Sequence, residues 1–463
     1  MANQTVKSID LKEVILHDVD GTEYTLTKVV TGFSYFESIF KPFVSGVINV
    51  ADSGVNLIGT LPIQGGEKVT IRILDVEEEE YTFELYVWKV YNRQFTKNLQ
   101  TYNLALVSRE ALYNEGVRLT EILNGTPDQI TKKILTEFLK TEKEVNVESC
   151  KYKVNFFPNG KKAHNIIQTL AQKSVANTSS SAKGNADKTT DKGKTGLSGD
   201  TKKSSGTAGY LFFENRDGFN FKSIDYYYST GEDKFDGDPE VETYEVKPNN
   251  DTKSRYVIEN YGYTNEIDII EQMRNGTYAS HLVAYNFSTG FYEEYRYNLQ
   301  ENYDSMSHLG SQAQLGKTQQ ELAINPSRVM TVLVDHETWM NEEGPGSPEE
   351  RDGGDTGSPF PDYQKHWLAQ SIARRYFMQN QKLEIEVPGN MELSVGDKIK
   401  VLLPNMAAEA ERQSEKYDTE NSGTYLIAAL SHNNVFLNNS TCTTKLELIR
   451  DIYGMKDYAS NVK

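Results

Sequence analysis

The segment closest to a catalytic motif is Gly316-Lys317-Thr318, which has the last residues of a phosphate-binding loop. That loop needs another glycine five positions before the glycine next to the lysine, so that backbone N–H groups can surround the phosphates. Ser311 occupies this position, Gly310 is one residue too early, and no strand-like run precedes the segment. Gly193-Lys194-Thr195 fails the same test. We therefore expect no nucleotide site.

Metal-binding patterns are also incomplete. Asp18, Asp20 and Gly21 have the spacing of the first half of a calcium loop. The twelfth position of that loop is Val29, which cannot supply the bidentate carboxylate that calcium needs. An Asp-Gly hairpin turn accounts for these residues. His336-Glu337 lacks the second histidine of a zinc-protease helix.

The remaining reactive residue types do not form a recognisable site. Cys150 and Cys442 are too few for a four-cysteine zinc site or a disulfide framework, and we expect both to be buried. Carboxylate pairs must arise by chance among 66 acidic residues, so a glycosidase pair stays open at this point. The histidines show no ligand spacing; they are His17, His164, His281, His308, His336, His366 and His432. We predict no catalytic, cofactor-binding or metal-binding residue, no cofactor and no enzymatic activity.

Composition narrows the class of protein. The chain has 463 residues, enough for roughly three domains. A net charge of -17 argues against a nucleic-acid binder held by phosphate contacts. The 28 tyrosines suit either protein interfaces or ordinary half-buried strands, and both readings stay open. The polar first residues predict no signal peptide, and no apolar run reaches the roughly 20 residues needed to span a bilayer. We expect a protein that is made in a cytoplasm and stays soluble until it assembles.

Regular elements dominate the end of the chain. Leu368, Ile372 and Tyr376 recur every fourth residue and predict a helix over residues 363–380. The period changes to two over residues 382–387, where aliphatic and charged residues alternate as in a strand. Further strands are predicted at residues 393–401, with a Gly-Asp turn inside, at 424–430 and at 441–449. This segment is a β-domain braced by a helix.

The first 110 residues predict an all-β unit. An Asp-Gly turn at Asp20-Gly21 joins two short strands into a hairpin. Residues 77–80 (EEEE) predict a solvated turn or strand edge. Further strands are expected at residues 44–50, 68–74, 81–90 and 101–107, with a short capped helix at 52–61. Several strands with short turns are typical of a sandwich or barrel.

The centre of the chain mixes helices, a hairpin and polar stretches. Thr126 is a plausible cap and Pro127 suits the first turn of a helix, and a second helix is predicted over residues 162–173. Residues 210–222 predict a hairpin with an Asp217-Gly218 turn. Residues 174–208 are too polar to offset their ordering entropy by burial, so we expect a flexible surface insertion. Long loops are predicted at residues 341–361 and 404–423.

Several of these segments together resemble the baseplate central hub protein of contractile-tailed phages and related hub proteins of contractile injection systems. The resemblance covers most of the chain in order, but it lies in structural patterns and not in catalytic signatures. The segments are residues 363–380, 393–399 (LSVGDKI), 425–434, 210–226, 256–261 (YVIENY) and 273–280 (MRNGTYAS). The insertion at 174–208 and the loop at 404–423 depart from the family pattern.

The resemblance implies a ring-shaped homotrimer in which two tube-like β-domains per subunit give a pseudo-sixfold ring. One face of such a ring docks the tail tube or a tube-initiator protein, and the other holds a trimeric central spike. Surrounding baseplate proteins are further partners, DNA passes as transient cargo, and no membrane is involved. The protein would assemble in the host cytoplasm and end in the tail baseplate of the virion. From the net charge we expect an acidic channel lining.

The predicted fold class is α+β and mostly β, with two tube-like β-barrel or sandwich domains and mixed α/β domains between them. The predicted domains are 1–112, a tube-like β-domain; 113–253, a mixed domain with the insertion 174–208; 254–295 with 381–455, the second tube-like β-domain; and 296–380, a mixed region with the loop 341–361 and a bracing helix 362–380. Two other functions stay open: a tail-associated peptidoglycan hydrolase or spike component, and a receptor- or glycan-binding tail module suggested by the tyrosines.

Overall fold

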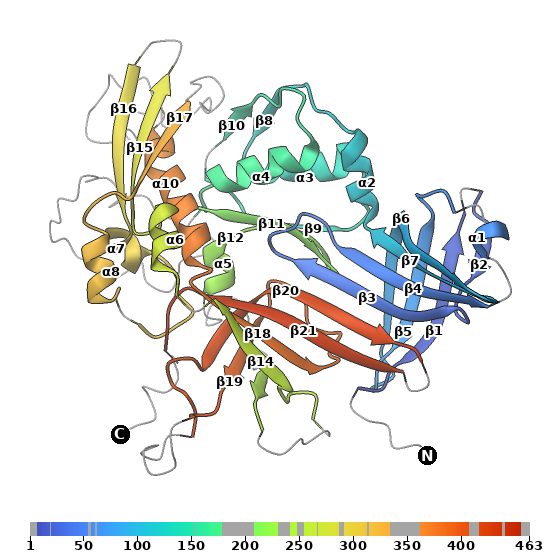
Figure 1. The fold of residues 1–463 in the computed structure, drawn as a ribbon. Coiled ribbons are helices and arrows are strands. Elements are labelled where there is room, and N and C mark those ends of the chain that lie inside the picture. The colour runs from blue at the N-terminus through green and yellow to red at the C-terminus, as the bar shows by residue number, and fades with distance from the viewer. Residues whose placement is uncertain are drawn as a thin grey trace.

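Figure 1 shows the computed structural model of the chain. The residues that the structure describes are 7–18, 20–53, 57–60, 63–151, 153–177, 208–229, 241–247, 254–265, 267–286, 291–312, 314–333, 362–406, 416–437 and 440–454. Most of the predicted insertion 174–208, the whole loop 341–361 and the middle of the loop 404–423 lie outside them. Gly193-Lys194-Thr195 and His336-Glu337 also lie outside the described residues.

The first strands alternate buried and exposed side chains, as the sequence predicts. They are β1 (Asp10–His17), β2 (Glu23–Thr25), β3 (Val30–Ser38), β4 (Ser45–Ser53), β5 (Lys68–Leu74), β6 (Glu80–Thr96) and β7 (Leu99–Val107), with the short helix α1 (Leu57–Thr60) after β4. All their pairings are antiparallel. The strands predicted in this part of the chain are confirmed, whereas β3 was not predicted.

The C-terminal strands form the second half of the same structure. They are β13 (Thr243–Glu245), β14 (Asn260–Asn265), β18 (Gln381–Pro388), β19 (Lys398–Leu402), β20 (Gly423–Val435) and β21 (Thr441–Arg450). The strand predicted at 393–401 begins only at Lys398. Its first residues form a turn that contains the predicted Gly396-Asp397, because Gly396 has a φ of 93° and the Asp397 carboxylate accepts a hydrogen bond from the Ser394 N–H at 2.9 Å.

The two β-blocks are joined edge to edge and do not form separate sheets. β20 pairs antiparallel with β3, so 13 strands make one sheet with the main order β14-β18-β21-β20-β3-β4-β7-β6-β5-β1-β2. The sequence shows no repeat between the blocks and gives no signal for this pairing. In Figure 1 the red strands β20 and β21 lie beside the blue strands β3 and β4.

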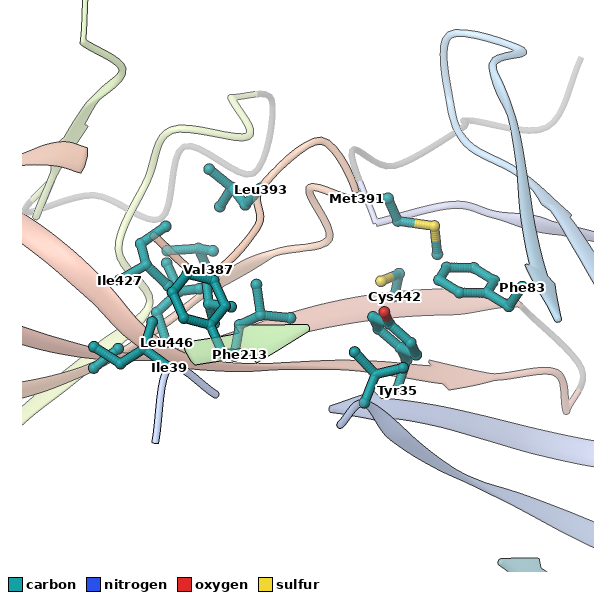
Figure 2. Close-up of a cluster of buried hydrophobic side chains, with 14 of the residues drawn as sticks. Tyr35, Ile39, Phe83, Phe213, Val387, Met391, Leu393, Ile427, Cys442 and Leu446 are labelled. Atoms are coloured by element: carbon teal, nitrogen blue, oxygen red, sulfur yellow. The ribbon is translucent and has the colours of Figure 1, made fainter. Parts of the chain in front are cut away.

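The sheet folds over itself, so one side of it is a continuous core. Phe33 on β3 makes an edge-on ring contact with Phe83 on β6, although β4 and β7 lie between these strands in the sheet. Gly46 on β4 leaves the room for this contact, since a Cβ there would stand 3.1 Å from the Phe33 ring and 3.0 Å from Leu85. Figure 2 shows side chains from both blocks in this one core, among them Tyr35, Phe83, Val387 and Leu446. Burial of this side fixes the register of every strand.

An α/β unit follows β7 and packs on the sheet through β11. Its elements are α2 (Arg109–Gly116), β8 (Leu123–Gly125), α3 (Pro127–Lys133), the π-helical turn Ile134–Phe138, β9 (Glu144–Val147), β10 (Val154–Phe156), α4 (Ala163–Lys173), β11 (Tyr210–Asn215), β12 (Gly218–Ser223) and α5 (Ile224–Tyr228). Thr126 and Gln129 form the capping box of α3, and β11 and β12 form the predicted hairpin. Both predictions are confirmed.

A third unit covers the other end of the sheet. It contains α6 (Ile269–Arg274), β15 (Ala279–Asn286), β16 (Phe291–Asn298), α7 (Leu299–Asn302), a 3-10 turn (Tyr303–Ser305), α8 (Lys317–Leu322), β17 (Arg328–Leu333) and α10 (Asp362–Phe377). α10 is the predicted helix, but its buried face, with Ala369, Ala373 and Phe377, packs on β15 and β16, whereas the sequence predicts a brace for the C-terminal strands.

The segment 254–295 is divided between two sheets, which differs from the predicted second β-block. β14 joins the large sheet, but β15 pairs with β16 and β17 in a separate three-stranded sheet. The reason is burial: Leu282, Tyr295 and Tyr297 lie in the core that α10 covers, and not in the core of the large sheet.

A candidate assembly surface on the large sheet

The motifs that could suggest chemistry have structural roles. Gly316 is the N-cap residue of α8, a helix of six residues. The Asp18 carboxylate accepts hydrogen bonds from the N–H groups of Asp20 and Thr22, both at 2.9 Å, as expected for a hairpin turn. Glu77 lies in the exposed turn between β5 and β6. In the described part of the chain, no group of three or more His, Cys, Asp or Glu side chains could hold a metal ion.

The side of the large sheet that faces away from the core is an extended surface. One row of paired residues crosses eight strands without interruption, from Asn260 on β14 to Tyr86 on β6. The row is Asn260, Glu386, Lys445, Ser431, Phe36, Ser45, Val107 and Tyr86. All eight strands are antiparallel to their neighbours, so the exposed face is one uninterrupted surface made by both β-blocks.

The middle of this face is uncharged. On β20, β3, β4 and β7 the outward residues are small, hydroxyl-bearing, amide-bearing or apolar. They include Ala429, Ser431, Asn433, Ser34, Phe36, Ser38, Ser45, Val47, Asn49, Thr101, Asn103 and Ala105. No Asp or Glu points outward on these four strands, which differs from the acidic lining expected for a channel; the acidic side chains of the face lie at its β14 margin. The middle of this face therefore offers no cations that could hold phosphate groups.

The β14 margin of the face is acidic and hollowed. Glu384 and Glu386 on β18 and Glu447 on β21 point outward, and Lys382 and Lys445 stand among these three carboxylates. Thr264 donates a hydrogen bond to Glu384 at 2.7 Å, and the Asn260 amide donates one to Glu386 at 3.2 Å. A groove of about 510 Å³ lies here, with Phe36, Phe43 and Tyr261 as its aromatic lining.

The β6 margin has the opposite charge. Residues 86–108 contain no Asp or Glu but include Lys89, Arg93 and Lys97, in a chain whose net charge is -17. The same stretch exposes large apolar side chains, with Trp88 55% and Phe95 68% accessible. Burial of these groups on folding is incomplete, which is typical of a surface that meets a partner.

Both margins end in an unpaired strand edge. β5 accompanies β6 only through Glu80–Tyr86, so residues 88–96 of β6 pair with β7 alone among the described residues. β14 pairs with β18 alone in the same part of the structure. Free strand edges carry N–H and C=O groups that can pair with another chain. The sequence analysis predicts β6 only as far as residue 90. Aromatic and β-branched residues continue to Phe95 and could have extended the prediction.

A buried carboxylate fixes the α/β unit and the C-terminal block to β3. Glu37 is 3% exposed and accepts hydrogen bonds from the N–H of Arg216 (2.6 Å), the N–H of Val395 (3.0 Å) and the hydroxyl of Tyr35 (2.9 Å). Burial raises the pKa of Glu37 to about 7, although these donors act in the opposite direction.

A second carboxylate makes a similar connection. Glu214 on β11 is fully buried, accepts a hydrogen bond from the Val44 N–H at 3.0 Å and pairs with the Lys143 ammonium. Burial raises the pKa of Glu214 above its usual value against the effect of Lys143. These contacts position the α/β unit on the large sheet, so the exposed face keeps a fixed relation to it.

No helix in the described residues has the length and apolarity to cross a membrane.

Comparison with known proteins gives the fold a counterpart. No family model and no curated protein matches the sequence. The crystal structure of the tail protein from Neisseria meningitidis MC58 is 12% identical, covers 95% of this chain and 96% of its own, and has a TM-score of 0.50. At this identity the likeness shows the fold alone. The chain therefore has the fold of a tail protein, which confirms the predicted resemblance at that level and the mostly β, α+β class.

Two further structures are similar with lower TM-scores. They are the 43 kDa tail protein of prophage MuSo2 from Shewanella oneidensis (11% identity, 95% of this chain and 100% of that chain, TM-score 0.47) and the prophage tail protein gp18 from Listeria monocytogenes EGD-e (11% identity, 95% and 94%, TM-score 0.42).

Proposed function

We propose that this protein is the structural hub of a contractile phage tail. Three copies form a ring that joins the sixfold tail tube to the trimeric central spike and continues the DNA channel. The observation that carries the proposal is the eight-strand exposed face, built from both β-blocks, uncharged in its middle and open at both edges. The tail-protein fold supports it.

The eight-strand face, with its uncharged middle, is the channel wall in this proposal. DNA carries a dense array of negative charges, so a cationic wall would hold it and a strongly acidic wall would resist its entry. A surface of Ser, Asn, Thr and Ala does neither. Three such faces would supply 24 strands, and a barrel of that size is about 45 Å between opposite backbones.

The division into units follows the same plan. The two tube-like blocks, 1–112 and 254–295 with 381–455, form the wall, except that β15 and β16 lie outside it. The α/β unit at 113–253 and the region 296–380 face the spike, the tube or tube initiator, and the surrounding baseplate proteins. In this proposal the protein has no enzymatic activity, needs no cofactor, resides in the tail baseplate and assembles in the host cytoplasm.

The test is the symmetry of the assembled particle. We expect purified protein at high concentration, or protein mixed with its spike, to give rings with threefold symmetry in negative-stain electron microscopy. Mass photometry should show a species of three chains. Protein that stays a single chain at every concentration, and also with the spike present, would contradict the proposal.

A further inference from the structure

The two strand edges at the ends of the exposed face, which are unpaired among the described residues, are complementary in charge. The edge of β6, residues 88–96, is basic and apolar, and the edge of β14 lies beside Glu384 and Glu386. They stand at opposite ends of the same eight-strand face. In Figure 1, β14 and β6 lie far apart, towards opposite ends of the large sheet.

We propose that the β6 edge of one copy of this chain pairs with the β14 edge of the next, head to tail. This inference rests on the proposed ring, and it names the surfaces that close it. A contact between two different surfaces of the same chain closes into a ring when the rotation between copies allows it. The occupant of each edge is therefore a second copy of this chain.

Strand direction supports this pairing. Each of the eight strands runs antiparallel to its neighbour, so β14 and β6 point in opposite directions. Rotation about a ring axis preserves the direction of every strand. The β6 edge of one copy then meets the β14 edge of the next in antiparallel orientation, like every other pair in the wall.

The stagger of the two edges supports it as well. On the row from Asn260 to Tyr86, β14 extends to one side and the free part of β6 to the other. Measured along the strands, their centres are about eight residues apart, or about 26 Å. Measured across the strands, one copy spans eight spacings of about 4.8 Å, the spacing to the next copy included. This slope is about 35°, within the 35–45° strand tilt that a closed barrel needs.

The side chains that would meet are matched. Lys89 pairs with Ala105 and so faces the exposed side, where Glu384 and Glu386 of the next copy lie. On the other side, Val90 and Phe95 are 36% and 68% exposed, and Tyr261 of the next copy is 37% exposed. Pairing buries these apolar groups and places a cation beside two carboxylates.

Cysteine pairs test the contact directly, since the native Cys150 and Cys442 are buried. Gly262→Cys faces the exposed side with open space around its Cβ. We combine it in turn with Lys89→Cys, Tyr91→Cys and Gln94→Cys, oxidise the full-length protein, and expect covalent dimers and trimers from at least one pair. The matched control combines Gly262→Cys with Glu13→Cys on β1. This strand lies near the end of the sheet and is the alternative partner for the β14 edge, so the control should give no covalent dimers or trimers.

Charge exchange gives an independent result. Lys89→Glu should raise the concentration for half-assembly about tenfold, and the triple change Lys89→Glu, Glu384→Lys, Glu386→Lys should restore it. Rings of three copies with cross-links only in the β1 control, or unchanged assembly of Lys89→Glu, would overturn the edge assignment and leave the proposed function standing. Absence of any three-copy particle in the unmodified protein would overturn the proposed function itself.

Discussion

The carboxylate of Glu37 accepts a hydrogen bond from the N–H of Val395 at 3.0 Å, although 358 positions separate the two residues in the chain. Glu37 lies on β3 and Val395 in the turn before β19, so this bond joins the two β-blocks inside the core. A charge in such a position is costly unless hydrogen bonds compensate for its burial. Stability of the protein should therefore report on the ionisation of this one group.

Glu37 should make the protein less stable as pH rises. Its pKa is about 7 in the folded protein and near 4.5 when exposed, so the folded state favours the protonated form. The stability that this preference contributes is full below pH 4.5 and is lost as the pH rises to about 7. The Glu37→Gln side chain is neutral at every pH. The free energy of unfolding of this variant, minus that of wild type, should therefore rise by roughly 3 kcal/mol from pH 4.5 to pH 7.5. Urea unfolding at both pH values measures this, and parallel curves for the two proteins would contradict it.

His432 should act in the opposite direction. It is fully buried beside the Thr444 hydroxyl at 2.9 Å, and burial lowers its pKa to about 4. Its contribution is present above pH 6.5 and is lost as the pH falls towards 4, because the unfolded chain binds the proton more readily. His432→Gln should reduce the acid sensitivity of the unfolding free energy by about 3 kcal/mol over this range. Equal acid sensitivity in both proteins would show that His432 is not held neutral.

Removal of Asp225 should be far more costly than removal of a surface carboxylate. Arg374 is 1% exposed, and it donates to the Asp225 carboxylate and, at 2.7 Å, to the Ser307 carbonyl. Asp225→Ala leaves this guanidinium buried without its counter-charge, which costs about 3–5 kcal/mol. Glu121→Ala, which removes the exposed pair with Lys133, is the control and should cost less than about 1 kcal/mol. Thermal unfolding that gives similar losses for both variants would contradict the assignment.

Gly218 should not tolerate alanine. Its φ is 138°, and a Cβ there would run into the backbone of Glu144, to which β12 pairs in parallel. Gly21 also has a positive φ, of 81°, but nothing lies within 4 Å of its Cβ position. Gly218→Ala should therefore lose about 2 kcal/mol or more beyond the loss in Gly21→Ala, since only the first adds a steric clash to the backbone strain. Chemical denaturation of both variants checks this difference.

Cations on the uncharged face should create DNA binding that the natural surface lacks. Ser34→Lys, Asn49→Lys and Asn103→Lys together place three ammonium groups on the outward side of β3, β4 and β7. We expect the triple variant to retard duplex DNA in a gel at low salt and to release it as salt rises, while wild type does not. The control adds three lysines away from the face, at Glu121, Glu142 and Glu144. Equal retardation by the control would show that net charge alone, and not the face, decides.

Periodicity was sufficient to predict many elements near the two ends of the chain, although it predicted neither β3 nor the helices α6, α7 and α8. The alternation in residues 382–387 and the four-residue spacing of Leu368, Ile372 and Tyr376 depend only on local burial, so β18 and α10 were predictable. The Gly396-Asp397 turn was predicted too, but the late start of β19 at Lys398 was not, because the conformation of residues 393–397 depends on the Asp397 side chain and on Glu37 from a distant strand.

The assembly surface was less accessible to sequence reasoning than the elements that carry it. Pairing of β3 with β20 depends on residues about 400 positions apart, and no local pattern records it. The division of 254–295 between two sheets has the same origin, since β14 and β15 look alike as strands and differ only in the core they meet. The absence of charge on the outward face became visible only when the registers of β20, β3, β4 and β7 were known.

The long stretch of chain between β14 and its partner β18 sets an order of events during synthesis. β6 and its basic edge leave the ribosome early, but β14 has no strand to pair with until β18 emerges more than 100 residues later. The acidic edge therefore does not exist until nearly the whole chain has been made. In the proposed head-to-tail contact, an incomplete chain can offer its β6 edge but not its β14 edge. Two chains that are both still being translated therefore cannot pair with one another.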